Sequence, residues 1–163
     1  MRLVILVAVA SAALFAATTA RATPPDHFTE SVDYSDSAPC TGFTNFYSGH
    51  QDVRGITTFD KQGNPVMDVV HIQGSELNWR SGTSDAYTVY FDFTFTYDYA
   101  ADVSSLKGQV IRVNYPGLGV LFHDVGNIIH YPGDVDVIHG PHDAFEQGQD
   151  AYCNAFLAIA NGT

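Results

Sequence analysis

The sequence predicts an all-β protein, namely a single antiparallel barrel of about eight up-and-down strands followed by a short C-terminal helix. The first observation is the segment 86–99, in which aromatic and polar residues alternate with the period of two typical of a half-buried strand. The second is a series of similar segments separated by turn residues. The third is a change to helical spacing in the last segment. A two-sheet β-sandwich is the alternative that these patterns allow.

Residues 1–22 are predicted to be a secretory signal peptide. Arg2 precedes an uncharged apolar run from residue 3 to 17, and Ala20-Arg21-Ala22 gives an A-x-A cleavage pattern. The apolar run is shorter than the roughly 20 residues needed to span a bilayer. We therefore expect a secreted protein without a membrane span, in which residues 23–163 form one domain.

The strands are predicted from apolar segments that end at turn signals. Gly49 and Gly55 are expected to mark bulges or a bend, and Gly74 to interrupt the strand that contains it. Asp60-Lys61-Gln62-Gly63-Asn64 predicts a hairpin loop. The predicted strands span 28–34, 42–59, 65–79, 86–99, 107–115, 120–131 and 135–139.

The alternation in 86–99 places a row of large side chains on one face of the sheet. That face carries Tyr87, Val89, Phe91, Phe93, Phe95 and Tyr97, and the opposite face carries threonines, Tyr90 and aspartates. A small barrel either fills its interior with side chains or holds one small ligand there. If it is hollow, the ligand-binding candidates are Tyr87, Phe91, Phe93 and Tyr97; a plain aromatic core is the alternative.

The last segment is predicted to be a helix held to the sheet by a disulfide. Its apolar stripe comprises Tyr152, Cys153, Phe156, Leu157 and Ala160, with Asp150 as the N-cap and Asn161-Gly162 as the stop. The chain has two cysteines, and an even number in an exported chain favours a Cys40–Cys153 bond. Two unpaired core thiols are the alternative, and a Cys–His nucleophile is a third option that is disfavoured because neither cysteine lies near a histidine in a recognisable pattern.

The composition disfavours several classes of partner. The chain has 18 acidic and 7 basic residues, a formal net charge of −11. Nucleic-acid binding depends on Lys and Arg at phosphates, so we expect none. No glycine-rich phosphate loop or dinucleotide fingerprint is present, so no cofactor is expected, and the serine-nucleophile patterns are absent as well.

Two groups of residues are candidates for a chemical site. His139, His142 and Asp143 carry ligand types that zinc accepts, although exposed turn histidines are the preferred interpretation. His123 and Asp124 are adjacent, so on a strand they face opposite sides. An inward Asp124 has a raised pKa if it is buried and is a candidate general acid, or else it bonds to the backbone near Gly126.

Several motifs resemble those of a group of short exported proteins from high-GC Gram-positive bacteria. The motifs are Cys40, the hairpin 59–66, Pro116-Gly117-Leu118-Gly119-Val120, the run 122–129, and the ending from Gly140-Pro141-His142 to Cys153. They are turn and strand features, so the resemblance implies no activity. The general pattern also looks like the small barrels of the lipocalin, avidin and allene-oxide-cyclase kinds, and this analogy concerns the fold alone.

The sequence therefore leads to three functional hypotheses. The first is a binding protein that holds a small apolar ligand inside the barrel. The second is a barrel enzyme that performs acid–base chemistry on a small hydrophobic substrate through Asp124, His123 or a tyrosine. The third is a structural envelope-associated protein whose barrel is filled. A cavity separates the first two from the third, and an inward titratable group separates the enzyme from the binder.

Overall fold

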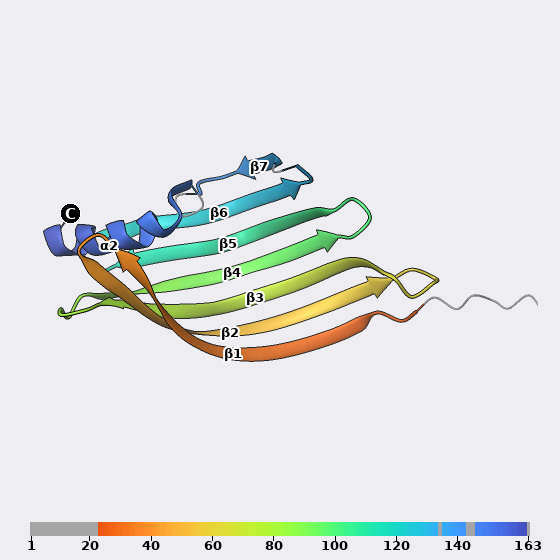
Figure 1. The fold of residues 1–163 in the computed structure, drawn as a ribbon, viewed down its shortest axis with the longest axis horizontal. Helices are drawn as coiled ribbons and strands as arrows, with labels where there is room; N and C mark the ends of the chain where they lie inside the picture. Colours follow the sequence, from red (N-terminus) through yellow and green to blue (C-terminus); the bar gives the residue numbers. More distant parts are fainter. Residues whose placement is uncertain (1–22, 134, 143–145, 163) are drawn as a thin grey trace, which may run out of the picture.

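Seven strands form one antiparallel sheet whose strand order follows the chain (Figure 1). This computed structural model describes residues 23–133, 135–142 and 146–162; the predicted signal peptide lies outside them. The predicted all-β antiparallel fold is confirmed, and the strands form one sheet, not the two of a sandwich. They are β1 (Asp26–Cys40), β2 (Phe43–Phe59), β3 (Pro65–Arg80), β4 (Ala86–Asp98), β5 (Val103–Tyr115), β6 (Gly119–Tyr131) and β7 (Val135–His139).

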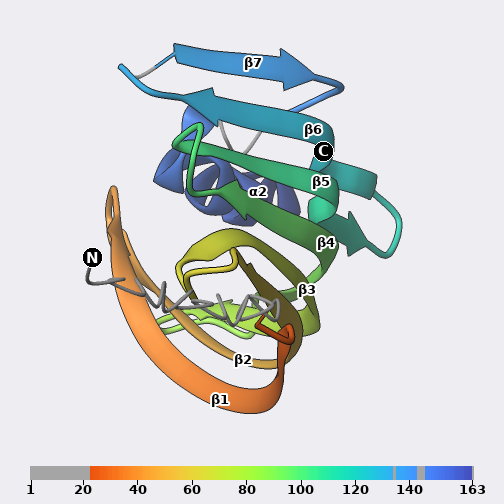
Figure 2. The same cartoon turned by 90° about the vertical axis from the view of Figure 1, so that its right-hand side faces the viewer.

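The sheet is strongly curved but is not closed (Figure 2). Among the described residues, β1 and β7 are the two edges and are not paired with each other, so the predicted barrel is not confirmed. The C-terminal helix, α2 (Gln149–Asn161), lies on the concave face at one end. It contacts both β1 and β6. The helix therefore bridges two distant parts of the sheet that strand pairing does not join.

Glycines in β2 and β3 leave space for aromatic rings on the concave face. The ring of Tyr34 lies where a side chain at Gly49 would be, and the Phe91 ring does the same at Gly74. The pairing of β1, β2 and β3 continues regularly through both positions. A bulge at Gly49 or Gly55 and an interruption at Gly74 are therefore wrong, whereas the bend that was the other expectation for Gly49 and Gly55 is compatible with the curvature of the sheet. Glycine is needed there because a ring from the neighbouring strand takes the space above it.

The helix ends are partly as the sequence predicts. Gly162 is the C-cap in a left-handed conformation, and its N–H donates to the carbonyls of Ala158 and Ile159, as predicted. The N-cap is Gly148, whereas Asp150 lies in the first turn, where its carboxylate favours the positive end of the helix dipole. Leu157 is 47% exposed and Ala160 is exposed as well, so the predicted stripe is wrong at these two positions.

The helix and the sheet are held together by a packed core and one covalent link. Phe156 is fully buried and packs on Tyr87, with ring centroids 4.7 Å apart, and on Phe43, at 5.6 Å. Cys40 and Cys153 lie at disulfide distance, with Cα atoms 5.7 Å apart, in agreement with the predicted bond. The end of β1 is thereby fixed to the helix.

Candidate functional site

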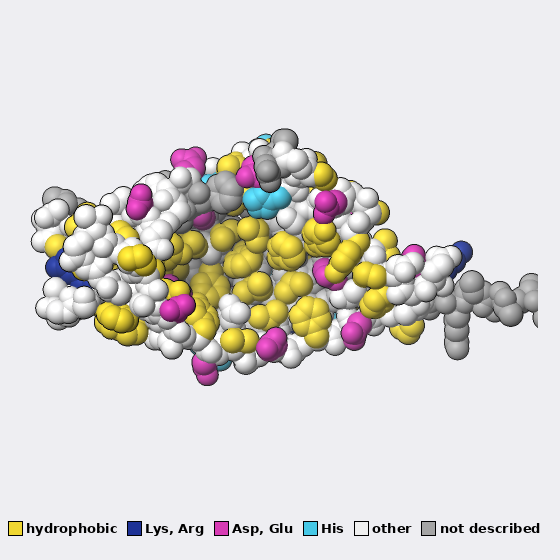
Figure 3. Space-filling view, viewed as in Figure 1, with side chains coloured by type: hydrophobic (Ala, Val, Ile, Leu, Met, Phe, Trp, Pro, Cys, Tyr) yellow, Lys and Arg dark blue, Asp and Glu magenta, His cyan; other side chains and the backbone are white. Residues whose placement is uncertain are grey.

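The concave face has a helix-covered end and an open end. At the covered end, Tyr87, Val89, Val113 and Phe122 are buried beneath α2. Beyond the helix, the same face continues with apolar side chains that are only partly buried. Figure 3 shows them as a hollowed apolar surface, with acidic side chains around its margin. The two ends meet beside α2, and this junction contains two pockets.

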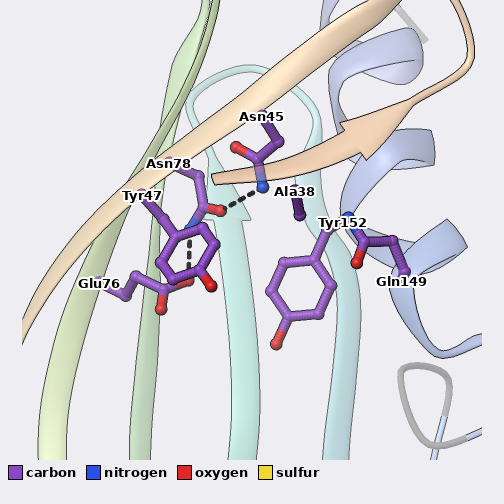
Figure 4. A pocket seen from close by; sticks show the side chains of 7 residues that line it. All are labelled: Ala38, Asn45, Tyr47, Glu76, Asn78, Gln149 and Tyr152. Carbon is purple, nitrogen blue, oxygen red and sulfur yellow. Dashed lines mark hydrogen bonds between the residues drawn. The ribbon is translucent and has the colours of Figure 1, made fainter. Parts of the chain in front are cut away.

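The first pocket lies between α2 and strands β1, β2 and β3, and has a volume of about 280 Å³. Figure 4 shows Tyr47 from β2 and Tyr152 from α2 on two sides of it, with Glu76 next to Tyr47. Its lining comprises Ala38, Asn45, Tyr47, Glu76, Asn78, Gln149 and Tyr152. The pocket is thus formed mainly by amides, tyrosines and one carboxyl group.

The second pocket opens toward the middle of the sheet and has a volume of about 260 Å³. It shares Glu76 and Tyr152 with the first pocket, so the two lie side by side around these residues. Its other lining residues are mostly apolar or aromatic: Tyr34, Gln51, Ile72, Val89, Phe91, Phe93, Val110 and Ile111. A polar compartment and a largely apolar one therefore adjoin at Glu76.

A chain of amides connects the buried end of β2 to this carboxyl group. Asn45 Nδ2 donates to Asn78 Oδ1 at 2.8 Å, and Asn78 Nδ2 donates to Glu76 Oε1 at 2.8 Å. Asn45 and Asn78 are both buried, at 2% and 0% exposure. Asn45 Oδ1 has no hydrogen-bond partner among the described residues. The amides thus direct their donors toward Glu76 and leave an unpaired acceptor at Asn45.

Three tyrosines around Glu76 have pKa values above the ordinary value. Burial is the main cause for Tyr34, Tyr47 and Tyr152, because it disfavours the charged phenolate. The negative charge of Glu76 also raises the pKa of all three, and at Tyr34 a hydrogen bond to Glu76 adds to the effect. These hydroxyl groups therefore remain neutral around the carboxyl group.

The sequence-predicted ligand residues separate into three positions. Tyr87 lies beneath the helix and donates its hydroxyl to the Tyr152 carbonyl at 3.0 Å. Phe91 and Phe93 line the second pocket. Tyr97 lies further along β4 and lines neither pocket. Its hydroxyl donates to Asp102 at 2.6 Å. Their role in ligand binding stays a prediction.

The residues that lie between the two pockets were missed from the sequence. Glu76 and Ile72 are separated by an even number of positions on β3, so a period-two analysis places both on one face. This shared face was the one sequence signal for the site. It is weak because the same face of β3 also contains Asp68, Gly74 and Asn78, so the pattern does not single out Glu76. Tyr34 and Tyr47 come from two other strands, and their approach to Glu76 depends on how the sheet curves.

The candidate acid–base residues lie on β6. Asp124 is 2% exposed and is paired in the sheet with Ile111, whereas His123 is paired with the exposed Arg112. Asp124 also contributes to the raised pKa of Tyr152, so its carboxyl group is near the pockets. Asp124 and His123 both already interact with other groups. A catalytic role for either residue stays a hypothesis.

The candidate metal ligands lie after β7. His142 is buried, forms an isolated bridge with Asp124, and has Nε2 3.2 Å from the His139 carbonyl oxygen. Asp143 lies outside the described residues. Within those residues, no three or more His, Cys, Asp or Glu side chains come together as a metal-binding group. The three-ligand metal site therefore stays a hypothesis.

Comparison with known proteins gives no match: no family model, curated protein or solved structure is similar to this chain. In the part of the chain that the structure describes, no helix has the length and apolar character needed to cross a membrane.

Proposed function

We propose that this protein is a secreted binding protein that holds one small apolar molecule on the concave face, beside α2. The observation that carries the proposal is the pair of adjoining pockets at the end of the helix. Each is slightly smaller than the roughly 300–1,000 Å³ typical of ligand sites, and the two share Glu76 and Tyr152. One molecule can therefore extend from the polar pocket into the apolar pocket.

The construction of the site supports a small ligand. A packed core and the Cys40–Cys153 link hold the helix in position, so one wall of the pockets is fixed before binding. The predicted signal peptide and this disulfide-distance pair support a location outside the cytoplasm. The apolar surface beside the pockets supports a ligand with a largely hydrocarbon body.

Titration with Nile red, a neutral dye sensitive to polarity, tests this function. We expect saturable binding with a blue shift in emission, competed by small apolar compounds. Ile72→Asn places a polar amide in the second pocket and should weaken binding about tenfold, since burying an unpaired amide costs roughly 1–3 kcal/mol. Leu77→Asn is the matched control, because Leu77 lies on the opposite face of β3 and is 46% exposed. Non-saturable binding, or equal effects of both substitutions, would contradict the proposal.

A further inference from the structure

We propose that the molecule bound beside α2 carries a positively charged amine, which pairs with Glu76 while its apolar body occupies the second pocket. This inference rests on the proposed ligand-binding function. It follows from the hydrogen-bonding groups around Glu76, from the distribution of positive side chains, and from the aromatic rings near the shared boundary of the pockets.

The first argument is the acceptor capacity of Glu76 and Asn45 at the boundary between the pockets. A carboxylate offers about four acceptor positions on its two oxygens. Asn78 Nδ2 supplies one donor to Glu76, and the Tyr34 hydroxyl interacts with the same carboxyl group. Asn45 Oδ1 is a further buried acceptor without a partner among the described residues. A ligand that enters here is therefore selected for hydrogen-bond donors, and an ammonium group supplies three.

The second argument is electrostatic. None of the Lys and Arg side chains between residues 23 and 133 lines either pocket. Arg80, for example, pairs with Asp85 at 2.9 Å. An anionic headgroup would meet the negative charge of Glu76 here with no Lys or Arg in the pocket lining, whereas a cation would pair with that charge.

The third argument is the set of aromatic rings close to Glu76. Tyr47 and Tyr152 line the polar pocket, and Tyr34 and Phe91 line its neighbour. Aromatic faces carry negative electrostatic potential and attract ammonium groups, most strongly at sites shielded from water. The rings and the carboxyl group therefore favour the same ligand charge, and the adjoining apolar pocket favours a hydrocarbon body attached to it.

Three probes with the same carbon skeleton test this inference: 4-phenylbutylamine, 4-phenylbutanol and 4-phenylbutyrate. Calorimetric titration is performed at about 0.15 M salt, where the Debye length of about 8 Å screens the distant surface charges. We expect the amine to bind at least tenfold more tightly than the alcohol, and the carboxylate to bind most weakly. Glu76→Gln keeps an acceptor for Asn78, so it should retain alcohol binding and bring the amine-to-alcohol ratio close to one.

Asp92→Asn is the control for a general loss of negative charge, because Asp92 is exposed and lines neither pocket. It should leave the ratio unchanged. Equal binding of amine and alcohol in the unaltered protein, tighter binding of the carboxylate, or an amine preference that survives Glu76→Gln would overturn the inference and leave the binding function standing. Two outcomes would overturn the proposed function and with it the inference that rests on it. One is that none of the three probes binds and the Nile red titration also fails. The other is that the protein forms a concentration-dependent dimer and that dimer formation abolishes binding.

Discussion

The two ends of the concave face differ in what covers them, although the same strands form both. At one end α2 covers Tyr87, Val89 and Phe122, and these side chains are buried. At the other end the strands extend beyond the helix, and at the boundary Phe93, on the same face of β4, lines the second pocket and is partly exposed. The covered end therefore contains the packed core, and the partly covered boundary between the ends contains the two pockets of the proposed ligand site. Predictions that separate the two roles test this division.

Removing the link between the helix and β1 should have the largest effect. The two cysteines are 113 residues apart, and the chain-entropy model gives about 4–5 kcal/mol for a loop of this size. Replacing Cys40 and Cys153 together by serine should lower the free energy of unfolding by that amount in denaturant titrations. Non-reducing mass spectrometry of the unaltered protein provides the control and should show one intramolecular bond. An unchanged unfolding midpoint would show that core packing alone holds the helix in place.

The second prediction compares an aromatic residue of the covered end with one at the boundary. Phe156→Ala should destabilise by roughly 3–5 kcal/mol, because this ring is fully buried between Phe43 and Tyr87. Phe93→Ala should cost about 1–2 kcal/mol, since the ring buries less area, and it should weaken ligand binding more strongly than it weakens folding. Thermal unfolding and dye titration of both variants provide the comparison. Equal losses of stability would contradict the division of the face.

The sequence predicted the covered end better than the boundary. Alternation in 86–99 placed Tyr87 and Val89 on one face, and the helical period placed Cys153 and Phe156 on the buried side of α2, because each signal is local to one segment. The position of Glu76 among Tyr34, Tyr47 and Tyr152 depends on four elements and on the curvature of the sheet. No single segment encodes that arrangement. Closure of the sheet was equally inaccessible, since it depends on pairing between the first and last strands.

Alkaline pH should lower the free energy of unfolding through tyrosines at both the covered end and the boundary. Burial raises the pKa of Tyr87 and Tyr152 above the ordinary value of 10.0, so the unfolded chain ionises before the folded one. The free energy of unfolding should therefore be constant with respect to these groups below about pH 9 and fall above about pH 10, by up to roughly 1.4 kcal/mol per pH unit for each tyrosine. The free energy of unfolding of the Tyr152→Phe variant should fall less steeply over pH 9–11 than that of the unaltered protein. Equal slopes for the two proteins would contradict the burial of this hydroxyl.

The smallest effect should come from the outward side of α2. Leu157 was predicted to lie on the buried stripe, but it is one residue beyond Phe156, and a rotation of about 100° per residue turns it away from the sheet. Leu157→Ala should change the free energy of unfolding by no more than about 0.5 kcal/mol, since exposed positions contribute little. A loss comparable with that of Phe156→Ala would show that another surface covers this side of the helix. Because Phe156 and Leu157 are adjacent in α2 but point in different directions, comparing the two variants shows which side of the helix packs on the sheet.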